Sequence, residues 1–111
     1  MSQSEITDRD TVITELIRRL VPVLQPEEIY LFGSQARGEA RPDSDYDVLL
    51  IVRDSAEPAY RREQAAYRAL WGLGAPVDVR VLTRAEFERQ ARVRTSLPAT
   101  VRREGRRVYA A

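Results

Sequence analysis

Apolar residues recur at every third or fourth position near the start of the chain. This spacing predicts an amphipathic helix that begins at Thr7 or Asp8 and runs to about Leu24, with one apolar face. Pro22 should end or bend this helix, because proline has no N–H to donate and its ring clashes with the preceding turn. The apolar face comprises Val12, Ile13, Leu16, Ile17, Leu20 and Val23.

Three later segments have the pattern of β-strands. Residues 28–32 form a short, mainly apolar segment, and residues 45–53 contain an unbroken apolar run. Such a run is typical of a central strand that is covered on both faces. Residues 77–82 alternate between apolar and charged side chains, so Val79 should face the core and Asp78 the opposite face.

Helical patterns separate and follow these strands. Residues 57–73 predict one helix, and residues 85–93 predict another, for which Thr83 is the N-cap and Glu86 completes a capping box. Residues 96–104 predict a last helical turn or two. The apolar side of the helix at 57–73 is expected to consist of Tyr60, Ala65, Tyr67, Leu70 and Trp71.

The alternation of strands and helices, with a last short strand at residues 106–109, predicts an α/β or α+β fold. We expect a mixed sheet of three to five strands flanked by helices. The length of 111 residues predicts a single domain over residues 1–111, with one core and little room for a second lobe.

Composition restricts the chemistry that is available. The chain has no cysteine and no histidine, so a bound metal would need oxygen ligands, which favours Mg²⁺ or Mn²⁺. All 18 basic residues are arginine, and there is no lysine. The role of a catalytic base therefore falls to a carboxylate, and the role of a basic side chain that binds phosphate falls to arginine. The net charge of +1 argues against nucleic acid as a direct substrate. No apolar run is long enough to span a membrane, and we expect a cytoplasmic location.

Two aspartates open the apolar segment at 45–53. Asp45 and Asp47 are separated by one residue, so on a strand their side chains point to the same face. A pair of carboxylates on one face suits Mg²⁺, which takes one or two protein carboxylates and fills its shell with water and phosphate. Taken alone, such a pair is more often two surface aspartates after a turn. An EF-hand loop is excluded, because Val48 stands where that loop needs glycine.

Gly33 and Ser34 follow the first strand and precede a short helical segment. A glycine lets the backbone approach a ligand, and the amides that open a helix attract anions. Arg37 lies one turn later and could reach a triphosphate. Exposure to solvent, or an ion pair with a nearby glutamate, is an equally good interpretation of this arginine. Asp78, considered by itself, is more often a solvated strand residue.

Together these positions resemble the nucleotidyltransferases of the DNA polymerase beta superfamily, and specifically the minimal nucleotidyltransferases. That pattern is Gly-Ser, then Ala-Arg-Gly, then Ser-Asp-x-Asp on a strand, and a third aspartate on a later strand. The matching residues here are Gly33, Ser34, Ala36, Arg37, Gly38, Ser44, Asp45, Asp47 and Asp78, and the resemblance covers about residues 27–82.

The resemblance implies a role for each matching residue. Asp45, Asp47 and Asp78 would be the catalytic metal ligands for two Mg²⁺ ions, with Asp78 at the ion nearer the acceptor. Gly33 and Ser34 would hold the β- and γ-phosphates of a nucleoside triphosphate. Arg37 and Ser44 would also contact the nucleotide. With no histidine or lysine present, Asp78 is the expected proton acceptor.

The same resemblance implies a function. Minimal nucleotidyltransferases commonly pair with a small helical partner of the HEPN class and act as antitoxins that adenylylate a tyrosine of that partner. We therefore expect transfer of AMP from ATP, or of another nucleotide, to a hydroxyl, within a homo- or hetero-oligomer. Two alternatives remain open: an antitoxin that neutralises its partner by contact alone, and a nucleotidyltransferase acting on a small molecule such as an antibiotic.

Overall fold

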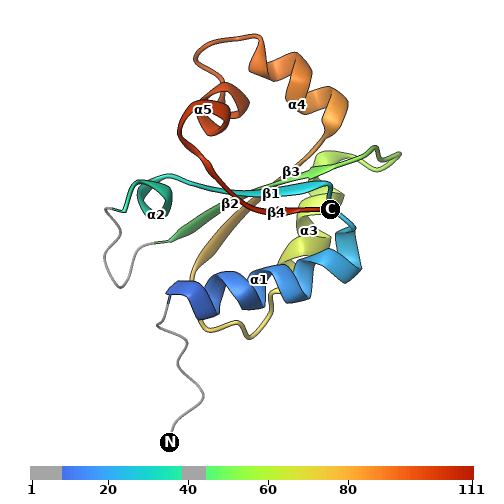
Figure 1. Cartoon of the computed structure of the whole chain (residues 1–111). Helices are drawn as coiled ribbons and strands as arrows, with labels where there is room; N and C mark the ends of the chain where they lie inside the picture. The colour runs from blue at the N-terminus through green and yellow to red at the C-terminus, as the bar shows by residue number, and fades with distance from the viewer. Residues whose placement is uncertain (1–8, 39–44) are drawn as a thin grey trace, which may run out of the picture.

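The computed structural model of the chain, drawn in Figure 1, describes residues 9–38 and 45–111. In chain order the elements are α1 (Arg9–Leu24), β1 (Glu28–Phe32), α2 (Ser34–Arg37), β2 (Tyr46–Val52), α3 (Ala59–Ala69), β3 (Val77–Thr83), α4 (Arg84–Ala91), α5 (Leu97–Glu104) and β4 (Arg106–Ala110).

The four strands form one mixed sheet in the order β3-β2-β1-β4. Strand β2 runs parallel to β3 and antiparallel to β1, and β4 pairs antiparallel with the other side of β1. The fold class and the mixed sheet are therefore as predicted. Strand β2 is an inner strand, and every residue from Val48 to Val52 is buried, as its unbroken apolar run indicated.

Helices cover both faces of the sheet (Figure 1). Helices α1 and α3 lie on one face, where the main core is centred on Leu16 and Leu20 of α1 and on Val48 and Leu50 of β2. Helices α4 and α5 lie on the other face, where Leu49 and Ile51 of β2 pack against Phe87 and Val101. Alternate residues of β2 thus supply two cores, because successive side chains of a strand point to opposite faces.

Helix α1 ends at Leu24, as predicted, although it continues through Pro22. A proline so near the C-terminus removes one hydrogen bond from the last turn, and the helix ends only two residues later.

The face of α3 that turns inward is not the predicted one. Its buried residues are Arg62 and Ala66, followed by Leu70 at the C-cap, whereas Tyr60, Tyr67 and Trp71 are exposed. Arg62 lies inside because its guanidinium donates to Glu86 of α4 at 3.0 and 3.3 Å. The inner face of α3 thus includes a buried arginine whose partner Glu86 is partly exposed, whereas the apolar count placed aromatic residues on that face.

The N-cap of α4 is as predicted, and α5 also has a side-chain cap. The hydroxyl of Thr83 accepts from the N–H of Glu86 at 3.1 Å, and the Glu86 carboxylate accepts from the N–H of Thr83 at 2.9 Å. The hydroxyl of Ser96 accepts from the N–H of Ala99 at the start of α5. These caps satisfy backbone donors that the first helical turn leaves without partners.

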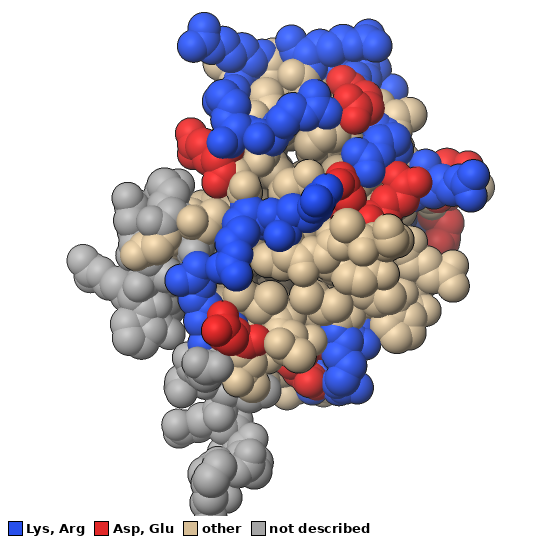
Figure 2. Space-filling view, in the orientation of Figure 1, with Lys and Arg blue, Asp and Glu red and all other residues tan. Residues whose placement is uncertain are grey.

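Arginines gather at the end of the molecule formed by α4 and α5 (Figure 2). Residues 84–107 carry eight arginines against three glutamates, a net charge of +5. Some of these arginines are paired. Arg84 donates to Glu27 and to Glu28, each at 3.0 Å, and Arg107 donates to Glu28 at 3.0 Å. This cluster ties α4 and β4 to the start of β1.

Candidate active site

Gly33 lies in the turn between β1 and α2 with a φ of +71°, a left-handed conformation that favours glycine. A Cβ at this position would overlap Oδ2 of Asp47. The backbone of Gly33 is therefore packed directly against the carboxylate of Asp47. The sequence placed these residues at one site, and the structure brings them into contact.

Asp47 and Asp78 are directly paired across the parallel strands β2 and β3. Their neighbours Tyr46, Val48 and Val79 are buried in the main core. Because successive side chains of a strand point to opposite faces, Asp47 and Asp78 point away from that core. The two carboxylates consequently lie on the same face of the sheet, the face that also carries α4 and α5. Asp45 precedes β2 and is exposed.

The donors at this site are of the type that Mg²⁺ prefers, because carboxylate oxygens are hard ligands. Asp47 and Asp78 can provide two of them from neighbouring strands, which fits an ion that completes its shell with phosphate and water. Within residues 9–38 and 45–111, no group of three or more carboxylates is close enough to hold a metal. Asp45 is thus not gathered with the other two aspartates in this arrangement.

The remaining predicted positions are placed as follows. Ser34 is the first residue of α2, so Gly33, and not Ser34, precedes the helix. Arg37 ends α2, and its side chain lies outside the described part of the structure. Gly38 follows with a φ of +75°, a left-handed conformation typical of the residue after a helix. Ser44 lies outside the described residues.

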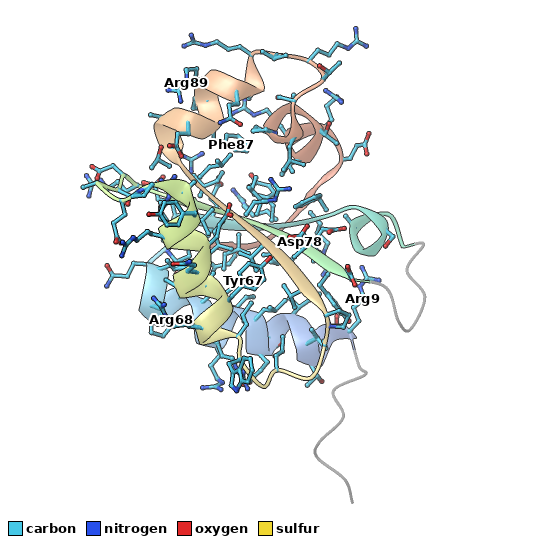
Figure 3. The ribbon with its side chains drawn as sticks, turned by 180° about the vertical axis from the view of Figure 1, so that it is seen from behind. Arg9, Tyr67, Arg68, Asp78, Phe87 and Arg89 are labelled. Carbon is cyan, nitrogen blue, oxygen red and sulfur yellow. The ribbon has the colours of Figure 1, made fainter. Side chains whose placement is uncertain are left out.

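Sequence reasoning missed Tyr67, which contacts the site from α3. Its hydroxyl accepts from the N–H of Val79 at 2.9 Å and donates to Oδ1 of Asp78 at 3.1 Å (Figure 3). Because a hydroxyl has a single proton, the bond from Val79 directs that proton to Asp78. Burial raises the pKa of Tyr67, the Val79 N–H opposes this, and the Asp78 carboxylate raises it further, so the hydroxyl stays protonated.

Tyr67 reaches Asp78 around the edge of the sheet, since β3 is an outer strand. Glu63, one turn earlier on α3, accepts from the N–H of Val81 at 3.4 Å. The two side chains cover backbone donors that an edge strand would otherwise expose. A tyrosine and a glutamate four residues apart on the helix before a strand are the only signal of this contact in the sequence.

A cavity of about 170 Å³ lies elsewhere, at the other end of β2. It is lined by Val52, Asp54 and Arg62, among other residues of α1, α3 and the segment after β2. Val52 is five residues along β2 from Asp47, which corresponds to roughly 16 Å on a strand. This cavity is therefore separate from the paired aspartates.

The sequence matches the nucleotidyltransferase domain family over residues 11–103. The chain belongs to this family. Among curated proteins it is similar to the bifunctional uridylyltransferase/uridylyl-removing enzymes of Bordetella pertussis and Bordetella parapertussis, with 32% and 31% identity over 91 residues. Those matches cover 78% of this chain and 10% of each relative, so the chain spans about a tenth of their length.

Solved structures share the fold of this nucleotidyltransferase. A Sulfolobus solfataricus protein assigned as a nucleotidyltransferase superimposes with a TM-score of 0.66 and 20% identity, over 99% of this chain and 90% of that one. A chain of a toxin–antitoxin complex with AMP-PNP gives a TM-score of 0.57 and 22% identity, over 94% and 75% of the two chains. A variant of the MntA-HpeT toxin–antitoxin gives 0.57 and 20%, with the same coverage.

None of the helices in the described part of this nucleotidyltransferase is both long and apolar enough to cross a membrane.

Proposed function

We propose that this nucleotidyltransferase transfers AMP from ATP to a hydroxyl group, with Mg²⁺, and that it acts as an antitoxin on a tyrosine of a HEPN-type partner. The observation that carries the proposal is the in-register pair of Asp47 and Asp78, with the backbone of Gly33 packed on Asp47. This arrangement offers two carboxylates on one face of the sheet, beside a backbone turn that has no side chain of its own.

Each residue of the pair has a distinct part in the proposed reaction. The acceptor oxygen attacks the α-phosphorus, the bond from that phosphorus to the β-phosphate oxygen breaks, and pyrophosphate leaves. Asp78 receives the acceptor's proton, because it lies on the outer strand where an acceptor can approach. Asp47, with Asp45 two residues before it in the sequence, would hold Mg²⁺, which when bound neutralises charge on the phosphates. Gly33 and Ser34 would contact the β- and γ-phosphates.

The antitoxin part of the proposal draws support from the shared fold with chains of toxin–antitoxin complexes, one of them solved with AMP-PNP. A second candidate function is transfer of UMP from UTP. It is favoured by the sequence similarity to enzymes named as uridylyltransferases. The experiment therefore compares ATP, UTP and the other two nucleoside triphosphates as donors.

The experiment incubates the chain with each of the four α-phosphate-labelled nucleoside triphosphates, Mg²⁺ and a co-expressed HEPN-type protein. Label on a tyrosine of that protein is the expected result. Asp78→Asn should still fold and bind the Mg²⁺ complex of the nucleotide, but lose roughly 10²–10⁴-fold in transfer, the usual contribution of a general base. Asp54→Asn, an exposed aspartate two residues after the end of β2, is the matched control and should transfer normally.

Growth on co-expression with the HEPN-type protein separates catalysis from neutralisation by contact. If transfer is the protective step, Asp78→Asn fails to restore growth although it still associates with the partner. Full protection by Asp78→Asn without detectable transfer would instead establish a binding antitoxin. Label on a small hydroxyl compound, and on no protein, would favour the antibiotic-modifying alternative.

A further inference from the structure

We propose that the outward side of α3 is the docking surface for the acceptor protein, and that the acceptor presents acidic residues around its reactive hydroxyl. We name this surface the α3 outer face and define it by Tyr60, Arg61, Tyr67, Arg68 and Trp71. The inference rests on the proposed function, because it concerns the route by which an acceptor reaches Asp78.

Large aromatic side chains lie in a row on this face. Trp71 is 88% exposed, Tyr60 57% and Tyr67 43%. Tyr60 and Tyr67 are seven residues apart, which is about two helical turns, and Trp71 follows four residues later just beyond the helix. The backbone carbonyl of Trp71 accepts from Arg19 of α1 at 2.9 Å, which fixes this end of the row. Exposed aromatic residues grouped in this way mark interaction sites.

The row leads directly to the catalytic carboxylate. Tyr67, its middle member, donates to Asp78 at 3.1 Å (Figure 3). A protein that packs on the exposed ring of Tyr67 therefore lies close to Asp78, at the outer edge of the sheet formed by strand β3. A docked partner could thus bring a hydroxyl to the position from which Asp78 receives a proton.

Charges on the two sides of the row indicate the chemistry of the partner. Arg61 and Arg68 are exposed, lie on the same side of α3 and form no ion pair with any residue that the structure describes. Arg61 lies over the ring of Tyr60, 5.8 Å from its centre. Arginine beside tyrosine and tryptophan is the composition of energetic centres in protein interfaces. The complement of two free guanidinium groups is a pair of carboxylates.

A protein partner fits this face better than a nucleic acid does. The α3 outer face carries two arginines, Arg61 and Arg68, and the carboxylates of Glu63 and Asp78 lie beside it. Nucleic-acid binding depends on many basic side chains that each neutralise a phosphate, and the chain gathers its arginines elsewhere, on residues 84–107.

The exposed area is also adequate for part of a stable interface. Fully buried Tyr and Trp side chains contribute about 150–250 Å² each, so these three, at their present exposure, offer roughly 400 Å². A standard interface buries about 800 Å² on each partner, so the row would supply about half of that area.

The test exploits Trp71, which is the single tryptophan of the chain. The acceptor probe is a random copolymer of glutamate and tyrosine, which is acidic and supplies hydroxyl groups. Titration of the full chain with this copolymer should change the Trp71 emission when tryptophan alone is excited. Arg61→Glu combined with Arg68→Glu should weaken this binding by about tenfold or more, because like charges then face each other.

The matched control is Arg89→Glu, an exposed arginine of α4 at the opposite end of the molecule (Figure 3). It should leave the copolymer affinity within about twofold of the parent chain, since surface charges far from a contact contribute little. Label transfer to the copolymer from a labelled nucleotide should fall in parallel with binding in the double variant. Pyrophosphate, which is released in each transfer to a hydroxyl, is measured in the same samples.

The results distinguish this inference from the proposed function. An unchanged Trp71 emission, an equal loss of affinity in Arg89→Glu, or tighter binding of single-stranded RNA at Trp71 would overturn the docking surface, whatever the pyrophosphate assay shows. Absence of pyrophosphate release and of transfer with every nucleotide would overturn the proposed function. The fluorescence titration would still decide whether acidic protein binds the α3 outer face.

Discussion

Replacement of Gly33 by alanine tests whether the backbone of this turn must lie against the Asp47 carboxylate. A Cβ would overlap Oδ2 of Asp47, and the φ of +71° is itself unfavourable for alanine. Gly72 offers a matched control. Its φ is +77° and a Cβ there would meet nothing within 4 Å, so Gly72→Ala carries the same backbone strain without the overlap.

The expected magnitudes follow from these two contributions. A left-handed conformation costs an L-residue about 1–2 kcal/mol, and the smaller entropy of the unfolded alanine chain offsets about 0.4–1 kcal/mol of this. Gly72→Ala should therefore lower the free energy of unfolding by about 0.5–1 kcal/mol. In Gly33→Ala the Asp47 side chain must also move, which costs about 0.5–1.5 kcal/mol when it leaves its rotamer.

Urea unfolding followed by circular dichroism measures the stability of both variants, and calorimetric titration with the Mg²⁺ complex of ATP measures binding. We expect Gly33→Ala to be less stable than Gly72→Ala by about 1 kcal/mol, or roughly 4 °C in Tm. It should also bind nucleotide at least about tenfold more weakly, which corresponds to about 1.4 kcal/mol. Equal stability and equal affinity of the two variants would refute the packing of Gly33 on Asp47.

Three further predictions concern neighbouring interactions. Tyr67→Phe leaves the Val79 N–H without its acceptor and should lower the free energy of unfolding by about 1–3 kcal/mol; equal urea midpoints for variant and parent would contradict this. Glu86→Ala removes the partner of the buried Arg62 guanidinium and also the capping bond to the Thr83 N–H, and should cost about 3–5 kcal/mol by urea unfolding. Adding Arg62→Leu should recover the part of this loss that is due to the guanidinium, while the loss of the capping bond remains. Burial raises the pKa of Glu28, but hydrogen bonds from arginines outweigh it, so the net pKa lies below its usual value. The folded state then binds fewer protons, and the contribution of Glu28 to stability, complete above the usual glutamate pKa, is lost as pH falls through the lower folded value. Urea midpoints measured against pH should therefore fall more steeply for the parent than for Glu28→Gln.

Local patterns in the sequence determined most of the elements. The strand at residues 28–32 has the predicted bounds, and the central position of β2 follows from its apolar run, because only a strand covered on both faces has such a run. The capping box of Thr83 and Glu86 was readable because both bonds lie within four consecutive residues. The family pattern likewise depends on residue types at a fixed spacing from Gly33 to Asp47, so these two residues were predicted to share a site, and the structure packs one against the other.

Tertiary structure alone decided which side of α3 faces the core. The spacing along a helix determines which residues share a face, but not which face turns to the core. Tyr67 can pack its apolar ring in a core or donate a hydrogen bond from its hydroxyl, and the neighbouring element decides between the two. Here it meets the edge of β3, and Arg62 takes the inner position because Glu86, 24 residues later, supplies a carboxylate there. Such long-range pairs leave no periodic signal in the sequence. The exposure of Trp71, and with it the α3 outer face, was therefore determined by partners that are distant along the chain.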